Sequence, residues 1–209
     1  MEFKSVNKIF EASFKKNWVR PAISNYQGET LCFRDVARRM EKLHIMFEEC
    51  GLEKGHKVAI CSRNQANWAV AFLATMTYGA VPVPLLHEFK SANIHHLVNH
   101  SEAKILFVDE VIWEGLSENE MPDVQAIIQV NTFKILYAVD EKIYDAKVHL
   151  NELFGRKYPE AFEPEMLNYY EDSADELAVI NYTSGTSGFS KGVMIPYRAI
   201  FSNLEFGTK

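Results

Sequence analysis

The segment 183–191 has the residue types of a phosphate-binding loop. An apolar run, 177–182, leads into it, and Lys191 closes it before a second apolar run, 193–195. Glycines let the main chain approach an anion closely, and small hydroxyl side chains add hydrogen-bond donors. A lysine ammonium is a compact charge that suits phosphate oxygens. The residues predicted to bind phosphate are Thr183, Ser184, Gly185, Thr186, Ser187, Gly188 and Lys191.

The spacing excludes two common catalytic loops. In a Walker A loop, GxxxxGK[ST], a first glycine at Gly185 places the second at Ser190, and Gly192 stands where Ser or Thr should follow the lysine. A nucleophile elbow, GxSxG, is excluded because Phe189 occupies the position of its closing glycine. From the residues alone, the remaining alternative is an ordinary polar loop between two strands.

The elements that would position this loop follow an alternating pattern. Apolar residues recur at helical spacing over 33–47, and Gly51 stands where a left-handed cap would end that helix. Two further helices are predicted, one capped by Asn64 and ended by Gly79, the other from Ser91. The predicted strands are 58–61, 81–86, 104–108, 126–130 and 134–138. This alternation predicts an α/β fold with a mainly parallel sheet and flanking helices.

The chain is predicted to divide at an acidic segment. Residues 160–176 hold seven acidic side chains and no basic one, which indicates a solvated linker. We therefore expect a first α/β subdomain over 1–159, the linker over 160–176, and the start of a second subdomain, with the phosphate-binding loop, over 177–209.

Composition excludes some function classes. The chain has 209 residues, a formal net charge of −6 and 47% hydrophobic residues, as in ordinary globular proteins. Nucleic-acid binding usually shows a basic footprint, so no nucleic-acid partner is expected. Cys32, Cys50 and Cys61 form no CxxC pair, which is typical of a reducing compartment. The N-terminal residues show no apolar signal-peptide core. We expect a cytoplasmic location, with association at a membrane surface as the alternative.

Two other patterns are relevant to function. The uncharged stretch 64–86 is broken by Gly79, Pro82 and Pro84, so a buried helix followed by a buried strand is favoured over a membrane span. His96 and His100 have a spacing that can bind zinc, but only Glu102 stands nearby to complete a set. Solvated or capping histidines are the favoured interpretation.

Residues 182–193 resemble the signature loop of the acyl-adenylate-forming superfamily, YTSGTTG-x-PKGV. Ser187 replaces the second threonine of the TT pair, Ser190 replaces the proline, and Tyr197 stands where the family commonly has a histidine. Further blocks at 50–60, 64–69 and 78–84 are similar to the family in the same order. The segment 99–108, NHSEAKILFV, is most similar to the long-chain fatty acyl-CoA synthetase branch.

The resemblance implies the first part of the large N-terminal domain of an AMP-forming acid–thiol ligase. Such enzymes use ATP and Mg²⁺ to convert a carboxylate, here a long-chain fatty acid, to an acyl-adenylate, and then transfer the acyl group to coenzyme A. The loop would hold the β- and γ-phosphates, and Thr183 is the expected Mg²⁺ ligand. The family's C-terminal domain and its catalytic lysine are expected to be absent from this chain. The chain alone is therefore expected to contain no catalytic residue and to be inactive.

Two alternatives remain open. Within the same superfamily, the enzyme could instead adenylate an aryl acid or an amino acid. In a different class, the chain could be a non-catalytic, adenylation-like binding module, which the departures at Ser190 and Tyr197 favour. No oligomeric state is predicted.

Overall fold

The computed structural model describes residues 2–183 and 191–207. Its centre is a five-stranded sheet with the order β4-β3-β5-β6-β7. The first four of these strands run parallel, and β7 is antiparallel to β6. The strands are β3 (Lys57–Cys61), β4 (Val81–Leu85), β5 (Ala103–Val108), β6 (Ala126–Gln129) and β7 (Ile135–Ala138). The predicted α/β fold with a mainly parallel sheet is confirmed.

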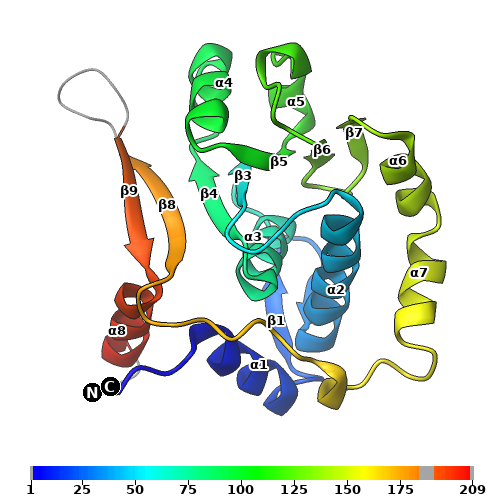
Figure 1. Cartoon of the computed structure of the whole chain (residues 1–209). Helices are drawn as coiled ribbons and strands as arrows, with labels where there is room; N and C mark the ends of the chain where they lie inside the picture. Colours follow the sequence, from blue (N-terminus) through cyan, green and yellow to red (C-terminus); the bar gives the residue numbers. More distant parts are fainter. Residues whose placement is uncertain (1, 184–190, 208–209) are drawn as a thin grey trace.

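Helices cover both faces of this sheet (Figure 1). One face packs against α2 (Phe33–Glu49) and α3 (Ala66–Tyr78), and the other against α4 (Ser91–His100). The short helix α5 (Glu110–Trp113) lies on the same side as α4. Side chains alternate accordingly along β3, where Val58 and Ile60 belong to the first core and Ala59 and Cys61 to the second. Strands buried on both faces need apolar residues at every position, as the predicted run 58–61 has.

The helix boundaries follow local glycine chemistry. Gly51 and Gly79 have φ angles of 65° and 90°, so both adopt the left-handed conformation expected after α2 and α3. The predicted cap at Asn64 is wrong, because the residue that caps α3 is Gln65 and its side chain makes no capping bond. Instead the Ala66 N–H donates to Asn25 Oδ1, 2.8 Å away, from the hairpin formed by β1 and β2.

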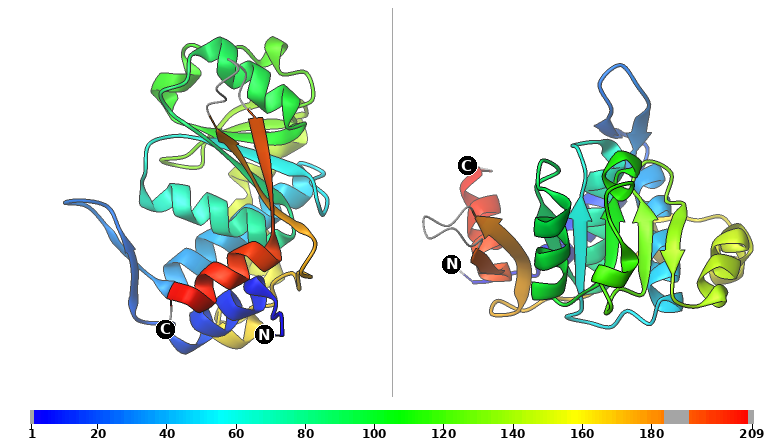
Figure 2. Two further views of the ribbon diagram at one scale, coloured as in Figure 1. Left: turned by 90° about the vertical axis from the view of Figure 1, so that its left-hand side faces the viewer. Right: turned by 90° about the horizontal axis from the view of Figure 1, so that it is seen from above.

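Several elements had no sequence prediction. The chain begins with α1 (Val6–Lys16), followed by the hairpin of β1 (Pro21–Ser24) and β2 (Thr30–Cys32), which projects from the body of the molecule (Figure 2). After β7 come α6 (Glu141–Val148) and α7 (Leu150–Lys157). Two 3₁₀ turns, Glu118–Glu120 and Pro164–Met166, complete the connections. Most of these elements are short, so their hydrophobic periodicity is brief.

The stretch 64–86 forms α3 and β4, as the broken apolar pattern predicted. Pro82 and Pro84 lie in β4, which is an edge strand of the five-stranded sheet and can tolerate the missing N–H donors. Across residues 2–183 and 191–207, none of the helices has both the length and the apolar composition to span a bilayer.

The acidic segment 160–176 is not solvated along its length. Phe162, Leu167, Tyr169 and Asp172 are all buried, so the solvated linker predicted here is wrong at these positions. The apolar residues among the carboxylates pack into the core that α2 and α3 form with the central sheet. The subdomain boundaries themselves, 1–159 and 177–209, stay a prediction.

A second small sheet follows this segment. β8 (Leu177–Thr183) pairs antiparallel with β9 (Lys191–Pro196), and α8 (Tyr197–Gly207) comes directly after it. β8 packs beside β4 without joining the five-stranded sheet (Figure 1). Ile180 and Tyr182 contribute to the same core as α4, which holds the hairpin against the five-stranded sheet.

Candidate nucleotide-phosphate site

The β8–β9 hairpin brings the two ends of the predicted phosphate-binding loop together. Thr183 and Lys191 are Cα partners in the final pair of the antiparallel register. Both side chains are exposed, while the preceding Tyr182 is buried, as expected for alternating faces of a strand. Directly opposed residues on antiparallel strands project to the same face. The hairpin therefore presents a hydroxyl and an ammonium side by side, where both can contact one anion.

The other predicted contact residues are those between these ends. Ser184, Gly185, Thr186, Ser187 and Gly188 lie outside the described residues, and so does Ser190. Their assignment to phosphate binding stays a prediction. The part that the structure brings together is the pair that closes the loop.

A buried tyrosine fixes the base of the loop. Tyr182 Oη and His100 Nδ1, at the end of α4, are hydrogen-bonded at 2.6 Å. Burial raises the pKa of the Tyr182 hydroxyl, so this group stays neutral around pH 7. His100, considered above as a zinc ligand, thus anchors β8. Within the described ranges no cluster of three or more His, Cys, Asp or Glu could hold a metal.

Gly192 allows the two strands to pack closely beside this anchor. A Cβ atom at Gly192 would lie 3.2 Å from both Ile180 Cγ2 and Tyr182 Cε1. Contacts this short require neighbours to move, and both neighbours are buried side chains. The glycine after the lysine is therefore explained by packing across the hairpin.

Tyr197 has a structural position behind the hairpin. Its side chain is buried, and its hydroxyl accepts from Asn7 Nδ2 at 3.3 Å and donates to the Met76 carbonyl at 3.4 Å. Burial raises the pKa of Tyr197 well above its usual value. These contacts tie α8 to α1 and α3. No role was predicted for Tyr197, and no signal in the sequence pointed to Asn7 as its partner.

The donor set suits a metal ion shared with phosphates. Mg²⁺ sites in nucleotide enzymes commonly combine one or two protein oxygens with phosphate oxygens and water. Thr183 can supply one such hydroxyl oxygen, and it is exposed at the mouth of the hairpin. This fits an ion that arrives with a nucleotide and completes its coordination with phosphate oxygens and water.

Comparison with known proteins decides the family. The profile of the AMP-binding enzyme family matches residues 10–208. This chain belongs to the AMP-binding enzyme family. The resemblance stated above is thereby confirmed, and so is its extent beyond the loop, because the match covers nearly the whole chain.

The relatives of this family member include enzymes of two kinds. Surfactin synthase subunit 2 of Bacillus subtilis is 25% identical over 197 residues, which are 94% of this chain and 5% of that protein. The long-chain-fatty-acid–CoA ligase of Salmonella typhimurium is 26% identical over 216 residues, 97% of this chain and 38% of the ligase. The chain thus spans well under half the length of both.

A solved structure shows the same fold. The anthranilate CoA ligase AuaEII, in complex with anthranoyl-AMP, superposes with a TM-score of 0.73 over 95% of this chain and 35% of that chain, at 16% identity. The fold is that of the N-terminal subdomain of adenylate-forming enzymes.

Proposed function

We propose that the protein carrying this chain activates a carboxylic acid with ATP and transfers the acyl group to coenzyme A. The observation that carries the proposal is the pairing of Thr183 with Lys191 at the mouth of the β8–β9 hairpin, in a chain of the AMP-binding enzyme family. The CoA-ligase activity named for the Salmonella typhimurium protein and for AuaEII supports the second step.

The first proposed step forms an acyl-adenylate. A carboxylate oxygen attacks the α-phosphorus of ATP, the bond from that phosphorus to the bridging oxygen breaks, and pyrophosphate leaves with the electron pair. Lys191 and the loop hydroxyls would hold the β- and γ-phosphates in line and offset the charge that builds on the leaving group. A bound Mg²⁺, with Thr183 as a ligand, would add further charge neutralisation on those phosphates.

The second proposed step forms the thioester. The thiol sulfur of coenzyme A attacks the acyl carbonyl carbon, the bond from that carbon to the AMP oxygen breaks, and AMP leaves while the thiol proton passes to solvent or a base. AMP is a far better leaving group than the oxide of the original carboxylate, which is why activation precedes transfer.

The proposed acid is a long-chain fatty acid. The segment 99–108 and the long-chain-fatty-acid–CoA ligase relatives support this choice. An aryl acid or an amino acid is the second candidate, supported by the surfactin synthase relative and by AuaEII, which is an anthranilate CoA ligase. A non-catalytic binding module is the third, and the Ser190 and Tyr197 departures are what favour it.

Acid-dependent ATP–pyrophosphate exchange tests the proposal. The assay uses the whole protein that carries this chain, with panels of fatty, aryl and amino acids. Lys191→Ala is expected to lower the exchange rate by about tenfold or more, since one lost charge-assisted contact to phosphate costs roughly 1.5–3 kcal/mol. Lys16→Ala, at an exposed lysine in the last turn of α1, is the matched control and should leave the rate unchanged.

The outcomes separate the candidates. Exchange with fatty acids that depends on Lys191 supports the proposal, whereas exchange only with aryl or amino acids supports the second candidate. ATP binding without exchange for any acid supports the binding module. The 209-residue chain alone is expected to bind Mg-ATP weakly and to give no turnover, and calorimetric binding in the micromolar range would contradict that expectation.

A further inference from the structure

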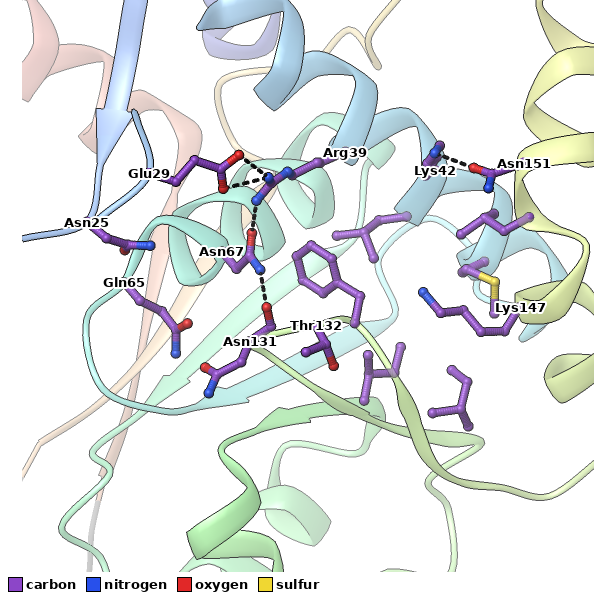
Figure 3. A pocket seen from close by; sticks show the side chains of 16 residues that line it. Asn25, Glu29, Arg39, Lys42, Gln65, Asn67, Asn131, Thr132, Lys147 and Asn151 are labelled. Atoms are coloured by element: carbon purple, nitrogen blue, oxygen red, sulfur yellow. Dashed lines mark hydrogen bonds and ion pairs between the residues drawn. The ribbon is translucent and has the colours of Figure 1, made fainter. Parts of the chain in front are cut away.

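A polar cavity lies across the molecule from the β8–β9 hairpin. It has a volume of about 430 Å³ and is lined by α2, the turn between β1 and β2, the start of α3, the β6–β7 turn, α6 and α7 (Figure 3). In Figures 1 and 2, α6 and α7 lie beyond β7 at one edge of the central sheet, and the β8–β9 hairpin lies beside β4 at the other edge. The cavity therefore shares no element with the candidate phosphate site.

Three basic side chains line the cavity, and they differ in how they are paired. Arg39 has a carboxylate partner, since it donates to both carboxylate oxygens of Glu29, at 2.9 and 3.1 Å, and also to Asn67 Oδ1 at 2.8 Å. Lys42 donates to a neutral acceptor, Asn151 Oδ1, at 2.6 Å. Among the described residues nothing accepts a hydrogen bond from Lys147 or pairs with it, and its ammonium points into the cavity (Figure 3).

Neighbouring positive charges disfavour the charged form of both lysines. Partial burial lowers the pKa of Lys147, and the neighbouring charge of Lys42 lowers it further. Burial and the charge of Arg38 lower the pKa of Lys42. Glu29, the one acidic residue of the lining, is already bound by Arg39. The cavity thus holds two ammonium groups without a carboxylate partner, an arrangement that an anion placed between them would stabilise.

Part of the cavity wall is held in a strained conformation. Phe133 in the β6–β7 turn has a φ of 55°, which is rare for a bulky residue and costs about 1–3 kcal/mol. The turn is fixed by a bond from Thr132 Oγ1 to Gln129 Oε1 and by one from Asn67 Nδ2 to the Asn131 carbonyl, at 2.8 Å. Such strain persists where the surroundings hold it, and it concentrates at binding sites.

We propose that this cavity binds a phosphate monoester, with the phosphate between Lys42 and Lys147. A phosphate monoester carries about −1.5 to −2 charges near pH 7 and so balances two ammonium groups, while a monocarboxylate would leave one of them uncompensated. The rest of the lining suits a hydroxylated body, because amides can both donate and accept hydrogen bonds. The amide side chains of the lining are Asn25, Gln65, Asn67, Asn131 and Asn151.

Calorimetry of the full 209-residue chain with glycerol 3-phosphate tests the proposal. Saturable binding is expected for the unmodified chain, and Lys147→Met should weaken it about tenfold or more, equivalent to about 1.4 kcal/mol. Lys142→Met is the matched control, because Lys142 lies on the same helix outside this lining and is largely exposed. That variant should bind as the unmodified chain does.

Two further measurements locate the ligand and guard against misfolding. Removing one of two repelling charges should leave Lys147→Met at least as resistant to urea as the unmodified chain, so lost binding cannot be ascribed to unfolding. Lysine ¹³Cε NMR should show the pKa of Lys147 rising when glycerol 3-phosphate is added.

The proposal is overturned by any of three results. The first is no saturable binding, and the second is equal affinity in Lys147→Met and the unmodified chain. The third is tighter binding of lactate or inorganic phosphate than of glycerol 3-phosphate, which would remove the monoester assignment. Glycerol alone, which lacks the anion, is expected not to bind.

Discussion

At the scale of single residues, the backbone conformation and the surroundings of a glycine decide how well a larger residue is tolerated there. Gly79 and Gly55 both have positive φ, at 90° and 77°. They differ in their surroundings: a Cβ atom at Gly79 would lie 2.9 Å from Tyr170 Cγ, whereas at Gly55 nothing lies within 4 Å. Two requirements, backbone conformation and close approach, therefore coincide at Gly79.

Gly79→Ala is expected to destabilise the fold more than Gly55→Ala. Both variants incur left-handed strain of roughly 1–2 kcal/mol. Only Gly79→Ala also displaces the Tyr170 ring, which adds an overpacking cost of about 1–3 kcal/mol. Urea unfolding monitored by circular dichroism measures the difference. Equal midpoints for the two variants would show that the contact with Tyr170 contributes nothing.

At the scale of elements, the acidic segment acts as a cap for the first helix. Asp172 accepts from Ser5 Oγ at 2.7 Å, the Val6 N–H at 3.0 Å and the Asn7 N–H at 2.8 Å. These are donors at the start of α1, where a helix leaves its N–H groups unpaired and a negative charge is favourable. A residue far along the chain thus completes α1, together with the local cap at Ser5.

Asp172→Ala should loosen α1 specifically. Removing the acceptor leaves buried N–H groups unpaired, and each such group costs about 1–3 kcal/mol. Hydrogen exchange of the α1 amides should accelerate more than that of the β3 amides. Asp172→Asn keeps one acceptor oxygen, so its α1 exchange rates should lie between those of the unmodified chain and those of Asp172→Ala. Glu171→Ala, at an exposed neighbour, should leave these rates unchanged. Uniform acceleration over the whole chain would contradict a local cap.

At the scale of the whole molecule, one buried carboxylate joins separate helices. Glu41 of α2 accepts a hydrogen bond from the Tyr158 hydroxyl and lies 3.4 Å from Lys157 Nζ and from His44 Nδ1. Burial raises the pKa of Glu41, but the hydrogen bond from His44 and the other partners outweigh burial and hold it at about 2. The folded state therefore favours the ionised form of Glu41.

This shift predicts a specific acid sensitivity. Because the folded-state pKa lies below the ordinary 4.5, the stabilisation is present above about pH 4.5 and is lost as the pH falls toward 2. Its size is of order 3 kcal/mol, from about 1.4 kcal/mol per pH unit. Urea unfolding at several pH values should show that the free energy of unfolding falls less between pH 5 and 3 for Glu41→Gln than for the unmodified chain. Glu48→Gln, at an exposed position, is the control, and an unchanged pH profile in Glu41→Gln would refute the assignment.

Sequence alone was sufficient for the parts of the molecule that are locally encoded. Helical spacing predicted α2, apolar runs predicted the strands of the central sheet, and the order of hydroxyls, glycines and Lys191 pointed to phosphate and to the family. These features depend on residues a few positions apart, whose periodicity and backbone preferences act before any distant contact forms.

Only the tertiary structure decided which distant residues meet. The cap of α1 by Asp172, the anchoring of Tyr182 by His100 and the meeting of Lys42 with Lys147 in one cavity join segments far apart in the chain. No periodicity encodes such pairs, because they form only when packing of the sheet and helices brings their elements together. The sequence therefore predicts that a carboxylate in an acidic segment, such as that of Asp172, is solvated. Only the folded chain shows that this carboxylate is buried and caps a helix.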